Sequence, residues 1–230
     1  MNWQTNSYLI ALRGFARKLG VTRILGRFLG GRSYEEAFDK ALFSYLQAGD
    51  TVWDVGANIG YYTSRFAEVV GPSGSVVAFE PFPVTAARLR GNIESFGNCQ
   101  LLDVALGAEA GIVMMEVGED DIGATNRIVG ISSQGVEVTV ATGDEILVDR
   151  ALGIPNVLKI DTEGFELDVL RGMPDLIAAP GLRALFIEVH FGLLAERGMA
   201  SAPADIENLL KAAGFTTRWI DPSHIAAVRS

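Results

Sequence analysis

The amino-acid sequence predicts a doubly wound α/β domain, in which a mostly parallel sheet carries helices on both faces. Short apolar runs alternate along the chain with stretches of helical periodicity, a rhythm typical of βαβ units. The runs are continuously apolar, as expected for strands that are buried on both sides. The chain of 230 residues, with 49% hydrophobic and 20% charged residues, suits one globular domain with a full core.

A helical extension is predicted ahead of this domain. Apolar residues recur at helical spacing over Tyr8–Leu29 with a break near Gly20, and a further helix is expected over Tyr34–Leu46. We therefore divide the chain into an N-terminal helical extension at residues 1–45 and an α/β domain at residues 46–230.

The domain itself is predicted to contain five core strands, two additional strands and a closing unit. The core strands are expected at Thr51–Val55, Val76–Phe79, Gln100–Val104, Val157–Ile160 and Leu185–Val189. The helices between them are expected near Tyr61–Val70, Pro83–Phe96 and Leu167–Leu170. The additional strands are expected at Ile112–Val117 and Val136–Val140. The closing unit comprises a helix at Ala204–Ala213 and strands at Phe215–Ile220 and Ile225–Val228, and it should add an antiparallel edge strand.

Charge is distributed unevenly along the chain. Residues 1–34 hold six of the 19 basic residues and no acidic one, so the rest carries 13 basic against 28 acidic residues. Such an acidic body argues against nucleic acid as the main partner. The basic amphipathic segment has two interpretations. It packs on the domain or across a homodimer, which we favour, or it makes peripheral contact with an anionic membrane or glycolipid.

Cysteine content and hydropathy bear on the compartment. Cys99 is the only cysteine, so no intrachain disulfide can form, which fits a reducing cytoplasm. No apolar run approaches the ~20 residues of a spanning helix. Residues 1–12 lack a basic stretch ahead of a long apolar core, so a signal peptide is not expected. We expect a cytoplasmic protein.

The loop after the first strand is the clearest candidate for a ligand site. Ligands in open α/β sheets bind at the carboxyl ends of the strands. Gly56 would let a ligand approach the backbone, and Gly60 would let the following helix pack close to the strand. Asp54 could accept a hydrogen bond from an ammonium group. A dinucleotide loop would carry a glycine at position 58, where this chain has Asn58, so a ligand without pyrophosphate is favoured.

The ends of the second and third strands add to this site. Glu80 follows the second strand, 24 residues after Gly56, where a carboxylate can accept hydrogen bonds from both hydroxyls of a ribose. Pro81 fixes the end of that strand. Asp103 at the third strand would either accept from an exocyclic amine of a base or only cap the turn.

Charged residues gather at the end of the fourth strand. Lys159 and Asp161 are two residues apart and share a strand face, so an ion pair is expected. Asp161 and Glu163 either face a cofactor and substrate or belong to a structural charge cluster. Glu166 should lie on the next helix, as a cap or as a partner for Lys159.

The fifth strand ends in Glu188 and His190, which also share a face. His190 is the better general base because an unperturbed imidazole titrates near neutrality, although a histidine at a strand end is often only structural. His224 is expected to be structural. Asp161, Glu163, Glu188 and His190 could also ligate a divalent metal, but the sequence has no dedicated metal motif, and we expect no metal.

A polar stretch lies before the strand at Val136–Val140. Such side chains suit a hydroxyl-rich acceptor, or they belong to a solvated loop. The residues concerned are Asp120, Asp121, Thr125, Asn126 and Arg127.

Together these motifs resemble one known family. The segments DVGANIGYYT at Asp54–Thr63, FEP at Phe79–Pro81, ALG at Ala105–Gly107 and KIDTEGFE at Lys159–Glu166 resemble those of FkbM-type methyltransferases. The resemblance covers about residues 45–215. The first motif is shared by many methyltransferases, whereas its combination with the last is fairly specific.

The resemblance implies a Rossmann-like seven-stranded sheet of the class I methyltransferase type with an antiparallel last strand. It also implies transfer of a methyl group from S-adenosylmethionine (SAM) to a hydroxyl of a sugar, glycolipid or polyketide-type natural product. The expected partner is thus a small-molecule or glycan acceptor. The alternatives are a nucleotide-cofactor oxidoreductase and a non-catalytic binding module on the same fold.

Site residues follow from the motifs and the resemblance together. The expected catalytic residues are His190, Asp161 and Glu163. The expected cofactor-binding residues are Asp54, Gly56, Asn58, Gly60, Tyr61, Thr63, Glu80, Pro81, Asp103, Val104, Ala105 and Asp161.

Overall fold

The computed structural model describes residues 31–116, 127–129 and 135–229. The helix predicted over Tyr8–Leu29 lies outside these residues, and so do four of the five residues of the polar stretch, Asp120, Asp121, Thr125 and Asn126. The roles predicted for them, the homodimer and the membrane contact all stay predictions.

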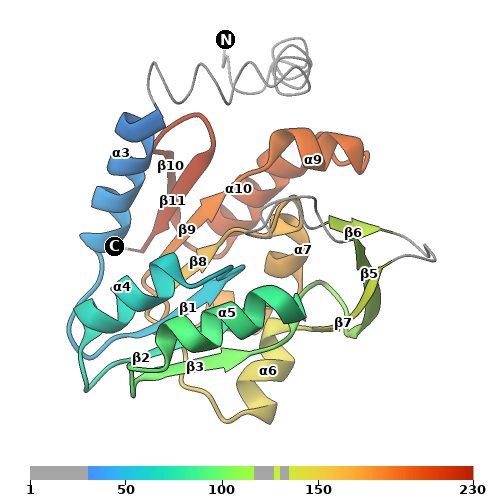
Figure 1. Cartoon of the computed structure of the whole chain (residues 1–230). Helices are drawn as coiled ribbons and strands as arrows, with labels where there is room; N and C mark the ends of the chain where they lie inside the picture. Colours follow the sequence, from blue (N-terminus) through green and yellow to red (C-terminus); the bar gives the residue numbers. More distant parts are fainter. Residues whose placement is uncertain (1–30, 117–126, 130–134, 230) are drawn as a thin grey trace.

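A seven-stranded sheet forms the centre of the molecule (Figure 1). Its strands are β1 (Thr51–Val55), β2 (Ser75–Phe79), β3 (Cys99–Leu102), β8 (Val157–Ile160), β9 (Ala184–Glu188), β10 (Thr216–Trp219) and β11 (His224–Val228). Their order across the sheet is β10-β11-β9-β8-β1-β2-β3. Strand β11 runs opposite to the other six strands of this sheet. The Rossmann-like class I fold with an antiparallel last strand is confirmed.

The expectation that the closing unit puts this antiparallel strand at the edge is wrong. Strand β11 lies between β9 and β10, so β10 is the edge strand. The reason is hydrophobic burial. Three consecutive residues of β11, from Ile225 to Ala227, are buried, whereas β10 alternates between exposed and half-buried residues.

Helices cover both faces of the sheet, as predicted (Figure 1). One face carries α3 (Gly31–Phe43), α4 (Tyr61–Val70) and α5 (Pro83–Ile93). The other carries α6 (Gly143–Asp149), α7 (Glu166–Arg171), α8 (Pro174–Ala178) and α10 (Ala202–Ala212), and α9 (Phe191–Glu196) follows β9. The sequence analysis missed α6, α8 and α9, because helices of five to seven residues are too short to show a helical period.

Successive residues of the central strands feed two separate cores. Trp53 and Leu158 pack under α7 and α10, whereas Val52 and Phe186 pack under α3 and α4. All four side chains are fully buried, which explains why these strands are continuously apolar in sequence.

Helix α3 takes part in the second of these cores. Phe38 and Leu42 are buried against the sheet, and the ring of Phe38 meets that of Phe186 at 6.1 Å. The domain boundary at residue 45 stays a prediction, but the helix before it shares its core with the sheet. Within the part of the chain that the structure describes, no helix is both long and apolar enough to cross a membrane.

A second, smaller sheet lies beside the first (Figure 1). It consists of β4 (Ala105–Leu106), β5 (Gly111–Glu116), β6 (Arg127–Val129) and β7 (Val136–Ala141), in the order β4-β7-β5-β6. The sequence predicted β5 and β7 but not their union with β4 and β6 in a separate sheet. Met115 of β5 lines the cavity described in the next section.

Candidate active site

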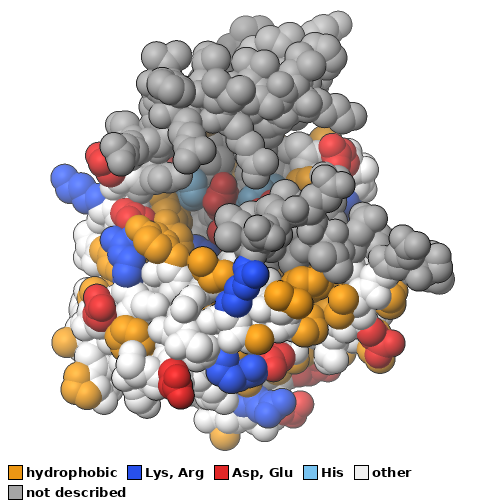
Figure 2. Space-filling model, viewed as in Figure 1, with side chains coloured by type: hydrophobic (Ala, Val, Ile, Leu, Met, Phe, Trp, Pro, Cys, Tyr) orange, Lys and Arg blue, Asp and Glu red, His pale blue; other side chains and the backbone are white. Residues whose placement is uncertain are grey.

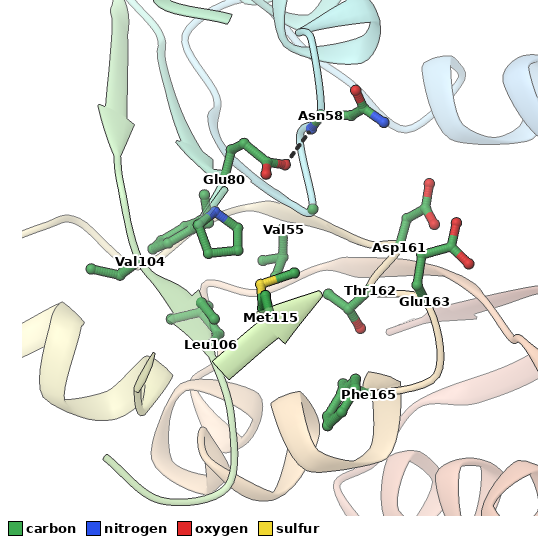
Figure 3. A pocket seen from close by; sticks show the side chains of 14 residues that line it. Val55, Asn58, Glu80, Val104, Leu106, Met115, Asp161, Thr162, Glu163 and Phe165 are labelled. Atoms are coloured by element: carbon green, nitrogen blue, oxygen red, sulfur yellow. Dashed lines mark hydrogen bonds between the residues drawn. The ribbon is translucent and has the colours of Figure 1, made fainter. Parts of the chain in front are cut away.

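A cavity opens at the carboxyl ends of β1, β2 and β8, where the sequence predicted a ligand (Figure 3). The small sheet closes one side of it through Leu106 and Met115. The lining residues are Val55, Gly56, Asn58, Phe79, Glu80, Pro81, Val104, Ala105, Leu106, Met115, Asp161, Thr162, Glu163 and Phe165.

Backbone geometry explains why the loop after β1 has glycine at positions 56 and 60. Gly56 has φ +77°, and a Cβ there would lie 1.8 Å from the carbonyl oxygen of Asp161. Gly60 has φ +92°, and its Cβ would lie 2.4 Å from Leu89 Cδ1 on α5. Gly56 thus admits the backbone after β8, and the ligand approach predicted for it stays a prediction. Gly60 admits a side chain of α5 rather than the strand that was expected. Gly56 also lines the cavity.

Glu80 is held at the cavity by two backbone amides. Asn58 N–H donates to its Oε2 and Phe82 N–H to its Oε1, each at 3.0 Å. Asn58 itself has a left-handed backbone conformation, with φ 50°. Burial raises the pKa of Glu80 to about 7, although the two amide hydrogen bonds oppose the rise. Each carboxylate oxygen keeps acceptor capacity for a further donor.

The remainder of this end of the cavity is apolar. Val104, Leu106 and Met115 lie beside Glu80 (Figure 3). We call Glu80 and these three residues the cofactor end. Among the described residues, the buried Oδ1 of Asn58 has no hydrogen-bond partner, so it offers an acceptor to a bound molecule. These features fit SAM, which has a ribose with two hydroxyls, a flat adenine and an ammonium group.

Asp54 and Thr63 lie behind the cavity wall rather than in it. Both are fully buried, and Thr63 Oγ1 donates to Asp54 Oδ2 at 2.7 Å. The ammonium of Lys159 is 3.4 Å from Asp54 Oδ1. Asp54 is thus already paired with an ammonium of this chain, and direct contact of Asp54 with the cofactor stays a prediction.

Two other predicted side-chain contacts lie outside the lining, and so does Gly60. Tyr61 is 61% exposed, and its hydroxyl accepts a hydrogen bond from Arg65 at 3.0 Å. Asp103 forms an exposed ion pair with Arg90 at 2.7 Å. The structure thus gives each residue a surface partner, whereas Pro81, Val104 and Ala105 lie in the lining as expected.

Two acidic residues line the opposite end of the cavity, and one imidazole adjoins them. His190 Nε2 lies 3.3 Å from Glu163 Oε2 and 3.8 Å from Asp161 Oδ1. Asp161 Oδ2 also meets Lys159 Nζ at 3.4 Å, as predicted. Asp161 and Glu163 point the same way, away from Glu80 (Figure 3). We call Asp161, Glu163 and His190 the charged end.

A buried carboxylate orients the imidazole of His190. Glu166 Oε1 lies 2.7 Å from His190 Nδ1 and accepts from Gly164 N–H at 2.8 Å. The expected pairing of Glu166 with Lys159 is therefore wrong. In the parallel register of β1 and β8, Lys159 stands beside Asp54, which places its ammonium between Asp54 and Asp161.

These surroundings shift the acid–base properties of the charged end. Burial lowers the pKa of His190, but the hydrogen bond to Glu166 and the charges of Glu163 and Asp161 outweigh it and raise the pKa to about 9. The expectation of a near-neutral imidazole is therefore wrong. Burial raises the pKa of Glu163 to about 7, so this carboxyl group titrates close to neutrality.

The comparisons with known proteins agree with this geometry. The Methyltransferase FkbM domain matches residues 54–217. The chain belongs to the FkbM methyltransferase family. Family membership decides against an oxidoreductase and makes the chain a SAM-dependent methyltransferase.

Two relatives illustrate the range of the FkbM family. The chain is 30% identical to the hexuronic acid methyltransferase AglP of Haloferax volcanii over 185 residues, which are 80% of this chain and 70% of AglP. It is 31% identical to the 31-O-demethyl-FK506 methyltransferase FkbM of Streptomyces tacrolimicus over 202 residues, with 74% of each chain covered.

Solved structures share the fold. A methyltransferase FkbM from Methylobacillus flagellatus superimposes with a TM-score of 0.54 at 16% identity. The match covers 78% of this chain and 43% of that one, so this chain spans less than half of its length. A Streptococcus mutans protein solved in complex with SAH superimposes with a TM-score of 0.51 at 13% identity, and the match covers 85% and 97% of the two chains.

Glu188 links the charged end of this FkbM-family site to His224. Its Oε1 lies 3.8 Å from His190 Nε2 and its Oε2 lies 3.5 Å from His224 Nε2. His224 Nδ1 lies 2.7 Å from Asp221 Oδ2, and the centroid of its ring lies 4.1 Å from that of Phe38, with the two planes tilted by 33°. His224 is thus anchored on both sides, which agrees with the structural role expected for it.

Several lining residues escaped the sequence analysis. Leu106, Thr162 and Phe165 stand inside quoted motifs, so their place beside Ala105, Asp161 and Glu163 was a signal for them. Met115 carried no signal, because its position depends on how the second sheet packs.

Proposed function

We propose that this FkbM-family chain is an O-methyltransferase that methylates a hydroxyl of a sugar, glycolipid or polyketide-type natural product. The observation that carries the proposal is the charged end, where Asp161 and Glu163 line the cavity and adjoin His190. A hydroxyl must lose its proton as its oxygen attacks the methyl group, and a nearby base accelerates such transfers by about 10²–10⁴-fold.

The residues of the cofactor end would hold SAM. Glu80 would accept hydrogen bonds from the ribose hydroxyls, and Val104, Leu106 and Met115 would contact the adenine. When bound, SAM supplies an electrophilic methyl group on a sulfonium. Asp161 and Glu163 stand across the cavity from Glu80, where they can orient an acceptor hydroxyl and take up its proton.

The charge of the site favours a hydroxyl over a carboxylate acceptor. Asp161, Glu163 and Glu188 all lie within 4 Å of one imidazole, and a further carboxylate would be repelled by them. A carboxylate acceptor also needs no base. The names of the two relatives, a hexuronic acid methyltransferase and a 31-O-demethyl-FK506 methyltransferase, support the sugar and polyketide classes.

The test is methyl transfer from SAM to a panel of methyl glycosides, hexuronic acid glycosides and polyketide alcohols, read by mass spectrometry as a gain of one methylene. Mild alkali then separates the products, because it cleaves a methyl ester but not a methyl ether. An alkali-stable product from the wild type that is strongly reduced in Glu163→Gln supports the proposal. An alkali-labile product alone contradicts it.

A further inference from the structure

The three side chains of the charged end come from two separate segments. Asp161 and Glu163 follow β8, and His190 follows β9. Each residue offers one ligand atom, and these three atoms all lie within 4.8 Å of one another. His190 Nε2 lies 3.8 Å from Asp161 Oδ1 and 3.3 Å from Glu163 Oε2. Neighbouring ligands about 2.1 Å from an octahedral ion stand about 3 Å apart, so small rotations of the two carboxylates would bring the three atoms to that spacing.

The imidazole is already oriented for ligation. Glu166, fully buried, holds Nδ1 of His190 at 2.7 Å, which leaves Nε2 to face the two carboxylates. His190 is only 6% exposed, yet within the described part of the chain its Nε2 has close carboxylates and no hydrogen bond. In metal-binding histidines, the ring nitrogen that does not bind the metal is typically held by a carboxylate, as Glu166 holds Nδ1 here.

The neighbouring contacts leave one oxygen of Asp161 available. Lys159 Nζ holds Oδ2 at 3.4 Å, so Oδ1 is the oxygen that faces His190. Lys159 is itself fixed by Asp54. Two of the three proposed ligands are thus held in place by a neighbouring side chain: Asp161 by Lys159 and His190 by Glu166.

An ion can reach this position from solvent. The side chains of Asp161 and Glu163 are 28% and 38% exposed, and both line the cavity. Histidine and carboxylate side chains are visible together on the face drawn in Figure 2. Three protein ligands leave coordination positions open for water or an acceptor oxygen.

We propose that Asp161, Glu163 and His190 bind one divalent cation of the Mg²⁺ or Mn²⁺ class. Two carboxylates with one imidazole form a donor set suited to these hard ions. The sequence analysis expected no metal because the ligands form no contiguous motif, and only the parallel pairing of β8 with β9 brings them together. This inference goes beyond the proposed function, because cation binding needs neither SAM nor acceptor.

The experiment is titration of the full-length, metal-stripped protein with Mn²⁺, followed by the electron paramagnetic resonance signal of the free ion. We expect one Mn²⁺ per chain, displaced by Mg²⁺. Glu163→Gln and His190→Gln should abolish the site. Glu166→Gln, which changes only the group behind the imidazole, should weaken it by about 10- to 100-fold.

The matched control is Glu188→Gln. Glu188 Oε1 also lies 3.8 Å from His190 Nε2. Like Glu163→Gln, this variant removes one carboxylate charge near the imidazole, but it does not remove a proposed ligand. Retained stoichiometry in Glu188→Gln, with loss in Glu163→Gln, supports ligation. No Mn²⁺ binding by the wild type, or equal loss in both variants, overturns it.

The cation site and the methyl transfer can fail separately. Wild-type protein that binds Mn²⁺ but methylates no hydroxyl contradicts only the proposed function. Protein that methylates a hydroxyl at full rate in EDTA, and binds no Mn²⁺, contradicts only the cation site.

Discussion

The two ends of the cavity are built in different ways. At the cofactor end, backbone amides fix the one carboxylate, Glu80, and apolar side chains supply the rest. At the charged end, side chains fix one another: Glu166 holds His190, and Lys159 holds Asp161. A backbone-built site tolerates changes of side chains around it, whereas a network of charges depends on each member. We therefore expect the two ends to respond differently to substitution.

The largest effect is expected where the two ends meet, at Gly56. Gly56→Ala would place a Cβ 1.8 Å from the carbonyl oxygen of Asp161 at a positive φ. We expect the free energy of unfolding to fall by about 2 kcal/mol or more and SAM binding to be lost. Urea denaturation and calorimetry with SAM measure both.

Gly97→Ala is the matched control for this change. Its Cβ would meet no heavy atom within 4 Å, and its φ is not positive, so both quantities should stay near the wild-type values. A Gly56→Ala variant with wild-type stability and wild-type affinity for SAM would contradict the close approach of Gly56 to the backbone of Asp161.

The next effect separates the two ends. Glu163→Gln and His190→Gln should each lower kcat for the hydroxyl acceptor by about 10²-fold or more, while the Kd for SAM changes little. The reason is that Glu163 lines the cavity on the side away from Glu80, and His190 lies 3.3 Å from Glu163. Steady-state kinetics and calorimetry on the same preparations test this. An equal loss of SAM affinity would mean that the ends are not separate.

A smaller effect is confined to the cofactor end. Glu80→Gln should weaken SAM binding by about 1.5–3 kcal/mol, the contribution of hydrogen bonds to a charged group. Asp103→Asn is the control, since Asp103 lies outside the lining and pairs with Arg90 at the surface. Calorimetry should find near wild-type affinity for it. A comparable loss of SAM affinity in Asp103→Asn would instead support the contact with adenine that the sequence suggested for Asp103.

The smallest effect depends on pH. Burial raises the pKa of Glu80 from 4.5 to about 7. A raised carboxyl pKa stabilises the fold below the unfolded-state value, and this contribution is lost as the pH rises through 7. The charged form is the one that accepts ribose hydroxyls, so SAM affinity should change in the opposite direction and fall as the pH drops below about 7.

The Glu80→Gln variant isolates this contribution. Wild type and variant should differ in the pH dependence of stability and of SAM affinity, with opposite signs, between about pH 4.5 and 7. Thermal unfolding and calorimetry over this range measure the two slopes. Parallel slopes in wild type and variant would show that Glu80 does not titrate there.

Sequence reasoning succeeded where structure follows from neighbouring residues. The apolar runs predicted the seven strands of the main sheet, and Glu80 at the end of β2 was placed at the cavity because the carboxyl ends of parallel strands meet. It also paired Lys159 with Asp161, two residues away.

Sequence reasoning failed where a feature depends on contacts between segments far apart in the chain. The pKa of His190 depends on Glu166, 24 residues earlier in the chain. Met115 reaches the cavity only because β5 pairs with β7 in the second sheet. The place of β11 depends on a competition for burial between two strands. None of these has a local pattern.

The inner position of β11 has a consequence for how the chain folds. Strand β9 ends at Glu188, and its neighbour β11 begins only at His224, after two helices and the edge strand β10. Until β11 arrives, one row of amides and carbonyls on β9 has no partner, and an apolar strand with an open edge invites pairing with another chain. Completion of the sheet is therefore expected to be a late, non-local step that slows folding. Substitutions in β11 should show themselves first as aggregation during refolding.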